Sequence, residues 1–266
     1  MIKIGGIEVK QNRFPDNTLL AKFDPNTEEF KYDRGAIVIE WLYEGDHELF
    51  TLICLKRHLE RHFSNLEIVL DMPYIPHARM DRVKNDEDIF TLKYFCEVIN
   101  SLNFKVVWVR DAHSYVSLAL LNNVEDTGVK NYVNKATELS KAAALFFPDE
   151  GATKRYSNLT DKPYAFGIKK RDWQTGKILG LELMNKEVAN GKDILIIDDI
   201  CSRGGTFFYA AKALKEAGAN KIYLYVTHCE NTILEGELLT SGLIEKVYTT
   251  NSIFTKEHEK IEVFEL

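Results

Sequence analysis

Short apolar runs alternate along this chain with segments of helical periodicity, and this alternation constrains the fold more than any other feature. The runs are continuous, rich in β-branched and aromatic residues, and bounded by turn-forming or charged residues, as buried strands are. Buried strands that alternate with helices predict an α/β protein whose parallel sheets carry helices on both faces. The predicted strands are 66–70, 104–109, 144–148, 194–198 and 222–227.

Helical periodicity fills the segments between these strands. In 49–63 and 89–102 the apolar residues recur at helical spacing and fall largely on one face. The segment 206–217 has the same periodicity, and Gly218 follows it where a glycine commonly ends a helix. The polar stretch 122–138 separates the earlier strands from the later ones. We therefore expect two α/β domains, 1–130 and 131–266. Packing of the last residues of the chain against the N-terminal domain stays open.

Composition and charge narrow the functional classes. The 266 residues suffice for one large domain or two ordinary ones, and 45% hydrophobic with 28% charged residues is typical of a soluble globular protein. A net charge of −6 argues against nucleic-acid binding as the main function, although local positive loops can still bind small anions. No apolar run approaches the roughly 18 residues of a membrane span, and the N-terminus lacks the apolar core of a signal peptide. The four cysteines have neither metal nor redox spacing, so we expect a reduced, cytoplasmic setting without membrane contact.

The segment DDICSRGGT at 198–206 holds the most specific chemistry. In open parallel sheets, ligands bind beyond the carboxyl ends of the strands. Gly204, Gly205 and Thr206 open a predicted helix, where free backbone N–H groups and the positive helix end favour a phosphate. Asp198 and Asp199 can accept hydrogen bonds from vicinal hydroxyls, as on a ribose. The segment therefore predicts a phosphorylated sugar, and a strand end with solvated acids and a glycine turn is the plainer alternative. The sequence G-x-x-x-x-G-K-[ST] does not occur, which argues against an ordinary Walker-type ATPase.

Motifs along nearly the whole chain resemble those of the ribose-phosphate diphosphokinase family, the phosphoribosyl pyrophosphate (PRPP) synthetases. DDICSRGGT at 198–206 resembles the family's DDxxDTGGT, and PYIPHARMDR at 73–82 is similar to its PYxPYARQDR. The motifs come in the family's order, which makes the resemblance specific. The other matches are FPDNT at 14–18 with F-x-D-G-E, DAHS at 111–114 with DLHA, PDEGA at 148–152 with SPDxGG, THC at 227–229 with THG, and TNSI at 250–253 with TNTI.

The resemblance implies transfer of the β,γ-diphosphate of ATP to the anomeric hydroxyl of a 5-phosphorylated ribose, with release of AMP. It also implies two domains of the type I phosphoribosyltransferase kind, with parallel sheets flanked by helices and the site between them. His113 and Asp149 match the positions that hold a magnesium ion (Mg2+) on the triphosphate, and His113 counts among the ATP-binding residues. Because histidine is a less usual magnesium ligand, a purely hydrogen-bonding His113 stays open.

The nucleotide-binding residues are also implied by the resemblance. Arg79 matches a nucleotide-binding arginine, whose guanidinium suits phosphate contact or stacking on adenine, and Asp81 lies in the same motif. A surface ion-pair cluster of Arg79, Asp81 and Arg82 is the alternative. Phe14 and Asp16 match an adenine-holding loop that, in the family, reaches in from a neighbouring subunit. We therefore expect a homodimer or a higher homo-oligomer.

A Lys-x-Arg pair after a strand stabilises the charge that develops on the transferred diphosphate in this family, and such stabilisation dominates transfers of this kind. The segment 164–177 contains the pair, and Lys169 and Arg171 fit it best. Lys170 takes the lysine role if the register shifts by one residue. A solvated basic loop is the alternative reading of the segment.

Departures from the family pattern bear on the acceptor. The family's third loop acid is Ser202 here, and the threonine after it is Arg203, at two positions that line the pocket for the sugar's 5-phosphate. The added positive charge favours a 5-substituent with more charge than a simple phosphate. We therefore favour ADP-ribose slightly as acceptor, giving ADP-ribose 1-pyrophosphate for NAD salvage. Ribose 5-phosphate, with Arg203 facing solvent, is the alternative. A phosphoribosyltransferase and a non-catalytic relative that regulates a partner are the remaining classes.

Overall fold

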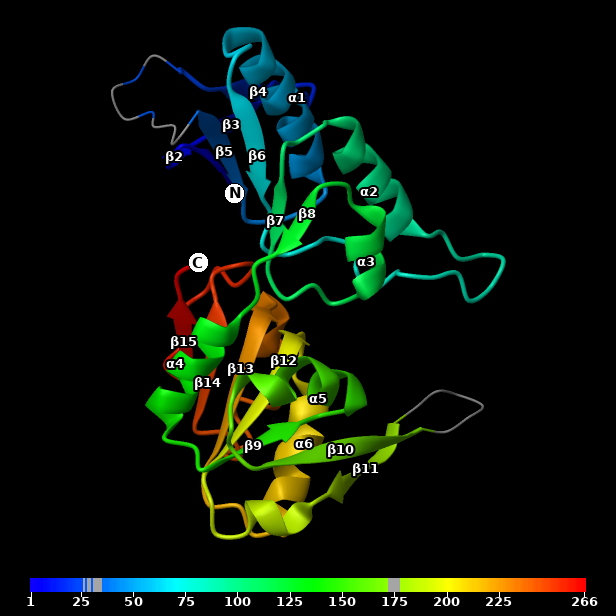
Figure 1. The fold of residues 1–266 in the computed structure, drawn as a ribbon, viewed down its shortest axis with the longest axis vertical. Helices are drawn as coiled ribbons and strands as arrows, with labels where there is room; N and C mark the ends of the chain where they lie inside the picture. The colour runs from blue at the N-terminus through cyan, green and yellow to red at the C-terminus, as the bar shows by residue number, and fades with distance from the viewer. Residues whose placement is uncertain (26, 28–29, 31–34, 172–177) are drawn as a thin grey trace. The chain divides into compact units, whose positions relative to one another are not determined.

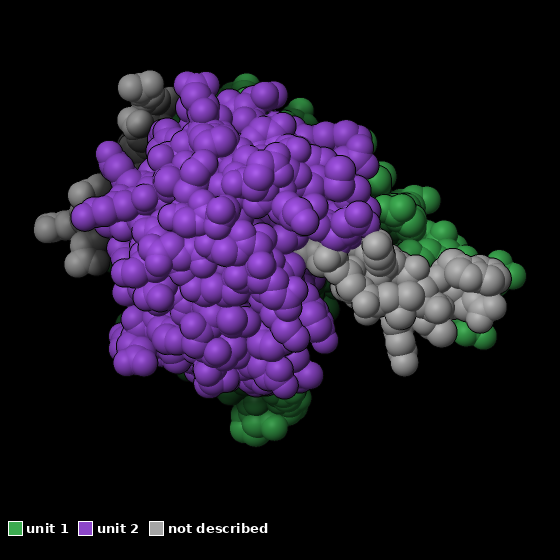
Figure 2. All heavy atoms as spheres, turned by 90° about the horizontal axis from the view of Figure 1, so that it is seen from below, with its two compact units in different colours: residues 1–128 green, residues 129–266 purple. Residues whose placement is uncertain are grey.

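The computed structural model describes residues 1–25, 27, 30, 35–171 and 178–266, and for 169–171 and 178–181 it describes the backbone alone. These residues form two compact units, Met1–Gly128 and Val129–Leu266, which Figure 2 colours separately. Each unit contains a β-sheet with helices packed against it (Figure 1). Most of the polar stretch 122–138 is structured, because β8 and α4 occupy both of its ends.

The first unit is built on a six-stranded sheet in the order β2-β1-β5-β6-β7-β8. Strands β5 to β8 run parallel, whereas β1 pairs antiparallel with both of its neighbours. The sheet is therefore parallel from β5 to β8, as expected, and has an antiparallel edge formed by β1 and β2. Its strands are β1 (Ile2–Ile4), β2 (Ile7–Glu8), β5 (Ala36–Trp41), β6 (Glu67–Asp71), β7 (Val107–Val109) and β8 (Val124–Asp126).

Three helices belong to the first unit: α1 (His47–His62), α2 (Thr91–Ser101) and α3 (Tyr115–Leu120). The helices predicted at 49–63 and 89–102 are confirmed as α1 and α2. The helix α2 buries Leu92, Phe95, Cys96 and Ile99, which recur at helical spacing and join the core beneath the sheet. A separate two-stranded hairpin is formed by β3 (Lys10–Arg13) and β4 (Leu19–Lys22).

The second unit is built on a seven-stranded sheet in the order β11-β10-β9-β12-β13-β14-β15. Only the β10–β11 pair is antiparallel among the described pairings of this sheet. The last strand, β15, pairs with β14, so the end of the chain packs into the second unit. The strands are β9 (Ala144–Phe147), β10 (Tyr164–Arg171), β11 (Ile178–Met184), β12 (Ile194–Cys201), β13 (Ile222–Cys229), β14 (Lys246–Thr250) and β15 (Ile261–Phe264).

Strand β12 shows why its sequence is continuously apolar. Ile194 and Ile196 belong to one buried cluster, together with Phe207 of helix α6. Leu195 and Ile197 belong to a second cluster on the other face, together with residues of α4 and α5. Both faces of this sheet are therefore covered by helices, as the alternation of elements predicts. The helices and short 3-10 turns are α4 (Lys130–Ser140), α5 (Glu150–Tyr156), η1 (Ser157–Leu159), η2 (Lys186–Ala189), α6 (Gly205–Glu216) and η3 (Asn231–Glu235).

Two details of the second unit bear directly on the predicted site. Strand β12 extends beyond the predicted 194–198 to Cys201, so Asp199 lies inside the strand together with Asp198 and not after it. The helix predicted at 206–217 is confirmed as α6, and Gly218 follows it with a φ of +89°, in the left-handed conformation that favours glycine. Within the described part of the chain, no helix is long and apolar enough to cross a membrane.

Candidate functional site

Two predicted loops of the first unit are joined by one side chain. The loop 73–82 follows β6 and the loop 110–114 follows β7, and these strands are parallel neighbours. Ser114 Oγ donates a hydrogen bond of 2.8 Å to Asp81 Oδ2 and accepts one of 3.2 Å from the backbone N–H of Val116. Ser114 therefore caps helix α3 and anchors Asp81 at the same time.

Asp81 also forms an ion pair with its neighbour Arg82, whose Nε lies 2.7 Å from Asp81 Oδ1. The hydrogen bonds from Arg82 and Ser114, with the nearby charges of Arg82 and His113, lower the pKa of Asp81. Asp81 therefore stays ionised at neutral pH. Asp81 and Arg82 form an ion pair, as in the surface cluster weighed from the sequence. The predicted nucleotide-binding Arg79 is exposed.

His77 fixes the middle of the loop 73–82 through its contacts, and it was not among the residues predicted from the sequence. His77 has a φ of +62°, which is uncommon for a residue with a side chain. Its Nε2 lies 3.1 Å from Asp46 Oδ1, just before helix α1, and its ring centroid lies 5.5 Å from that of Phe95. Met80 N–H closes the turn on the His77 carbonyl at 2.8 Å, and Arg79 lies within this turn.

The loop 110–114 is fixed at its start and at its middle. Arg110 Nη1 lies 3.2 Å from Asp71 Oδ1 at the end of β6, and both side chains are largely buried. Burial raises the pKa of Asp71, and the charge of Arg110 opposes that shift. The N–H groups of Asp111 and Ala112 donate to the carboxylate of Asp126, at 3.0 and 3.2 Å. These contacts place the predicted ligand His113, which is half-buried, directly beside Ser114.

The segment 14–18 forms the tip of the β3–β4 hairpin. Phe14 N–H donates to the Thr18 carbonyl at 3.0 Å, and the Phe14 side chain is 49% exposed. Asp16 Oδ1 accepts hydrogen bonds from the Thr18 hydroxyl at 2.7 Å and from its backbone N–H at 3.0 Å, which lower the pKa of Asp16. An aromatic ring and a carboxylate are therefore presented at the surface by a tight turn.

In the second unit, helix α5 carries two functional groups at its two ends. Asp149 precedes the helix, and its Oδ1 accepts a hydrogen bond of 3.0 Å from the N–H of Ala152. Near the other end, Arg155 Nη1 lies 2.8 Å from Asp199 Oδ2 of strand β12. The two side chains are only 19% and 8% exposed. The short helix thus links the predicted metal ligand Asp149 to the predicted ribose ligand Asp199.

Arg155 is not among the residues predicted from the sequence, although it pairs with the predicted ribose ligand Asp199. A basic residue in the last turn of a helix is ordinary, so its local sequence carries no signal for this role. Its partner Asp199 becomes reachable because β9, which leads into α5, pairs in parallel with β12. The carboxylate of the preceding residue is held locally, since Asp198 Oδ1 accepts a hydrogen bond of 3.0 Å from Asp199 N–H.

The predicted phosphate loop runs from Ser202 to Thr206, between β12 and α6. Gly204 has a φ of +80°, and a Cβ there would lie 2.9 Å from Leu238 Cδ2. Both facts require glycine at this position. Gly205 and Thr206 form the first turn of the twelve-residue helix α6, whose N-terminal N–H groups favour an anion.

The two residues that depart from the family pattern both contact the segment after β13. Ser202 Oγ lies 3.3 Å from Thr232 Oγ1. Arg203 Nη2 donates a hydrogen bond of 2.9 Å to Glu235 Oε2, and the side chains are 71% and 59% exposed. Arg203 therefore faces solvent with a carboxylate beside it, so the added positive charge of the loop is offset locally.

Two cysteines meet beside this loop, although they are far apart in the sequence. Cys201 and Cys229 are paired in register on β12 and β13, and both are fully buried. The hydrogen bond with Cys229 and burial raise the pKa of the Cys201 thiol. The thiol is therefore protonated and unreactive at neutral pH.

The predicted catalytic pair lies on a strand, where a loop after a strand was expected. The backbone of Lys169 and Arg171 belongs to β10, which pairs antiparallel with β11 in a long hairpin (Figure 1). The register shifts between Lys170 and Arg171. The side chains of 169–171 and the whole of 172–177 lie outside the described residues, so the roles of Lys169 and Arg171 remain predictions.

The described residues contain no ready-made cluster of three or more histidine, cysteine, aspartate or glutamate side chains for a metal. The predicted ligands belong to different units, His113 to the first and Asp149 to the second. The carboxylate of Asp149 nevertheless suits magnesium, which usually takes one or two protein carboxylates and completes its shell with phosphate oxygens and water.

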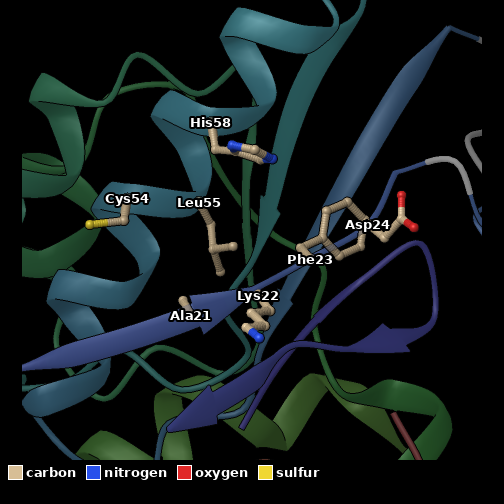
Figure 3. Close-up of a pocket in the computed structure, with 7 residues that line it drawn as sticks. All are labelled: Ala21, Lys22, Phe23, Asp24, Cys54, Leu55 and His58. Atoms are coloured by element: carbon tan, nitrogen blue, oxygen red, sulfur yellow. The ribbon is translucent and has the colours of Figure 1, made fainter. Parts of the chain in front are cut away.

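A separate cavity of about 540 Å³ in the first unit contains none of the predicted site residues. Figure 3 shows Cys54, Leu55 and His58 of α1 on one side of it, and residues 21–24 on the other. Burial, followed by the charges of His62 and Arg61, lowers the pKa of His58. This cavity is distinct in composition from the predicted site, since it lacks the motifs described above.

Comparison with known proteins agrees with this fold and these motifs. Residues 184–265 match the phosphoribosyl synthetase-associated domain. The chain is 28% identical to the ribose-phosphate pyrophosphokinase of Pyrococcus abyssi over 97% of this chain and 88% of that protein. It is 31% identical to the enzyme of the same name from Listeria ivanovii, over 83% and 70%.

A solved structure supports the fold. The crystal structure of phosphoribosylpyrophosphate synthetase from Mycobacterium smegmatis superimposes with a TM-score of 0.74 and 18% identity, over 97% of this chain and 86% of that one. The fold is therefore of the kind expected from the motifs. The chain belongs to the ribose-phosphate pyrophosphokinase family of ATP-dependent diphosphotransferases.

Proposed function

We propose that this protein transfers the β,γ-diphosphate of ATP to the anomeric hydroxyl of ribose 5-phosphate and releases AMP. The observation that carries the proposal is the end of strand β12, where Asp198 and Asp199 are followed by the loop that opens helix α6. Carboxylates for ribose hydroxyls and N–H groups for a 5-phosphate then lie at one strand end. The names of the relatives, which are ribose-phosphate pyrophosphokinases, support the same acceptor.

We assign the ATP loops to the first unit and the sugar loop to the second. In this assignment, Phe14 and Asp16 hold adenine across a subunit interface, so the active form is a homo-oligomer. Arg79 contacts the nucleotide phosphates, and Ser114 holds Asp81 of the same loop in place. His113 and Asp149 would hold magnesium, which neutralises charge on the triphosphate when it is bound.

In the proposed reaction the anomeric oxygen of the sugar attacks the β-phosphorus of ATP. The bond between the β-phosphorus and the oxygen bridging it to the α-phosphorus breaks, AMP leaves with that oxygen, and the hydroxyl proton is lost to solvent. Asp198 and Asp199 orient the ribose through its hydroxyls, and Arg155 holds the Asp199 carboxylate. Lys169 and Arg171 stabilise the negative charge that develops on the diphosphate.

ADP-ribose is the second candidate acceptor, and Arg203 is the observation that favours it. Its side chain is 71% exposed at the loop where the 5-substituent would bind. A guanidinium pairs well with phosphoryl oxygens, and ADP-ribose carries a diphosphate at this position. The product would be ADP-ribose 1-pyrophosphate, which would place the protein in NAD salvage.

The experiment is to offer purified protein ATP and magnesium with either ribose 5-phosphate or ADP-ribose, and to resolve AMP and the products by mass. AMP with a pyrophosphorylated product from ribose 5-phosphate supports the main proposal. The same result from ADP-ribose alone selects the second candidate. If neither acceptor yields AMP while ATP still binds, the protein is not a diphosphokinase for these sugars, and a regulatory role replaces the proposal.

A further inference from the structure

The segment 230–238, which we name the wall segment, follows strand β13 and contacts the phosphate loop residue by residue. Glu230 N–H donates to the Cys201 carbonyl at 2.8 Å, and Thr232 Oγ1 lies 3.3 Å from Ser202 Oγ. Further along, Glu235 pairs with Arg203. Leu238 packs so close to Gly204 that a Cβ there would lie 2.9 Å from Leu238 Cδ2. The wall segment thus lines the loop from its first residue to the start of α6.

A further contact brings the two backbones close together at Gly236 and Arg203. A Cβ on Gly236 would lie 1.9 Å from the carbonyl oxygen of Arg203 and 2.8 Å from its carbonyl carbon. The φ of Gly236 is −91°, which any residue adopts, so glycine is required here by close approach alone. Because real Cβ atoms do not come so close to backbone, the position of the loop at Arg203 depends on the wall segment.

The loop and the wall segment are also joined by an ion pair between Arg203 and Glu235. Arg203 is the only cationic residue of the sequence 198–206, and Glu235 Oε2 lies 2.9 Å from its Nη2. Both side chains are more than half exposed, and an exposed ion pair is weak. A phosphoryl group, which accepts paired hydrogen bonds from a guanidinium, can therefore take the place of the carboxylate.

We propose that Glu235 is a specificity-determining residue that sets how many phosphoryl groups the acceptor carries at its 5 position. While Glu235 pairs with Arg203, the loop binds one phosphate through its backbone N–H groups. An acceptor with a second phosphoryl group reaches Arg203 only by displacing Glu235. This inference rests on the proposed function to the extent that the loop receives the 5-phosphoryl end of the sugar.

The test is Glu235→Gln in the full-length protein, which keeps the size of the side chain and removes its charge. The ratio of kcat/KM for ADP-ribose to kcat/KM for ribose 5-phosphate is measured for the variant and the wild type. We expect the ratio to rise by about two- to fivefold, the range that corresponds to one exposed ion pair. In an Arg203→Thr background, Glu235→Gln should leave the ratio unchanged, because the cation is gone.

Glu237→Gln is the matched control. Glu237 is exposed two residues further along the wall segment, and its backbone carbonyl accepts hydrogen bonds from Thr240 and Ser241. The same charge is removed, so an equal shift of the ratio in both variants would overturn the proposal. So would a shift by Glu235→Gln that persists in the Arg203→Thr background. Circular dichroism checks that each variant is folded. Glu235→Asp keeps the charge, so its ratio of kcat/KM values should equal that of the wild type, and this comparison remains possible if Glu235→Gln is unstable.

A binding readout separates this inference from the proposed function. The affinities of the protein for inorganic pyrophosphate and inorganic phosphate are measured by calorimetry with the same variants. Glu235→Gln should raise the affinity for pyrophosphate relative to phosphate, and only when Arg203 is present. If no sugar yields AMP but this shift occurs, the proposed reaction is wrong and the role of Glu235 stands. If AMP forms and neither readout shifts, Glu235 has no role in selection.

Discussion

The Ser114 hydroxyl donates a hydrogen bond of 2.8 Å to the carboxylate of Asp81, 33 residues earlier in the chain, and thereby joins the loops 73–82 and 110–114. The same oxygen accepts from the N–H of Val116 at 3.2 Å, so one side chain also caps helix α3. The residue is 9% exposed, which protects both hydrogen bonds from competition with water. The loops it joins are those to which we assign the binding of ATP.

Replacement of Ser114 by alanine should loosen both loops. Loss of the cap should lower the free energy of unfolding by about 1 kcal/mol. The pKa of Asp81 should rise, because one of the hydrogen bonds that lower it is gone. We expect a several-fold higher KM for ATP with little change in kcat, measured by steady-state kinetics. Ser114→Thr, which keeps the hydroxyl, is the control, and an unchanged KM in Ser114→Ala would contradict a role in ATP binding.

The ion pair between Arg155 and Asp199 predicts a large effect on stability. Arg155→Met leaves the carboxylate of Asp199 buried without its guanidinium, and breaking a buried pair from one side costs about 3–5 kcal/mol. Since Arg155 is 19% exposed, we expect the lower end of this range in urea denaturation. The double variant Arg155→Met with Asp199→Asn should recover part of the loss. Additive losses in the double variant would show that the pair does not couple the two residues.

The prediction for catalysis concerns the replacement of Lys169 and Arg171. If they stabilise charge only in the transition state, Lys169→Ala or Arg171→Ala should lower kcat by on the order of 10²–10³ with a modest change in nucleotide affinity. Lys170→Ala tests the register, and its kcat should stay near that of the wild type. Unchanged turnover in both Lys169→Ala and Arg171→Ala would mean that the catalytic segment lies elsewhere.

His58, beside the cavity of Figure 3, predicts a pH-dependent contribution to stability. Burial and the charges of His62 and Arg61 lower its pKa in the folded state, so the unfolded state binds the proton more tightly. The contribution of neutral His58 to the free energy of unfolding is therefore fully present above the unfolded-state pKa of about 6.5. It is lost as the pH falls from that value through the lower pKa of the folded state.

His58→Asn should accordingly lose less stability than the wild type when the pH is lowered from about 8 to about 5, since the titrating group is absent. The measurement is the midpoint of urea denaturation at both pH values. His47→Asn, at the exposed start of the same helix, is the control for removal of a histidine. Equal losses in His58→Asn and the wild type would contradict the lowered pKa.

Several strands were not predicted from the sequence, among them the short edge strands β2 and β8 and also β5 and β14 in the interior of their sheets. Strand β2 has two residues and β8 has three, so neither forms a recognisable pattern. Strand β10 was expected to end in a basic loop, yet it continues through Lys169 and Arg171 because β11 returns beside it. The edge strand here is β11, and because an edge strand has one side in solvent, polar residues do not prevent pairing at this edge of the sheet.

The sequence by itself determined strands β6, β7, β9, β12 and β13, helices α1, α2 and α6, and the two aspartates that precede a glycine turn near the end of β12. Continuous apolar runs, helical spacing, adjacent aspartates and a glycine turn are local patterns, and short-range sterics and burial decide their conformation. Only the tertiary structure decided which distant side chains meet. Arg155 reaches Asp199 across 44 residues of chain, and Cys201 faces Cys229 across 28, because strand order and register bring them together. Those depend on the packing of the whole unit, which no local pattern records.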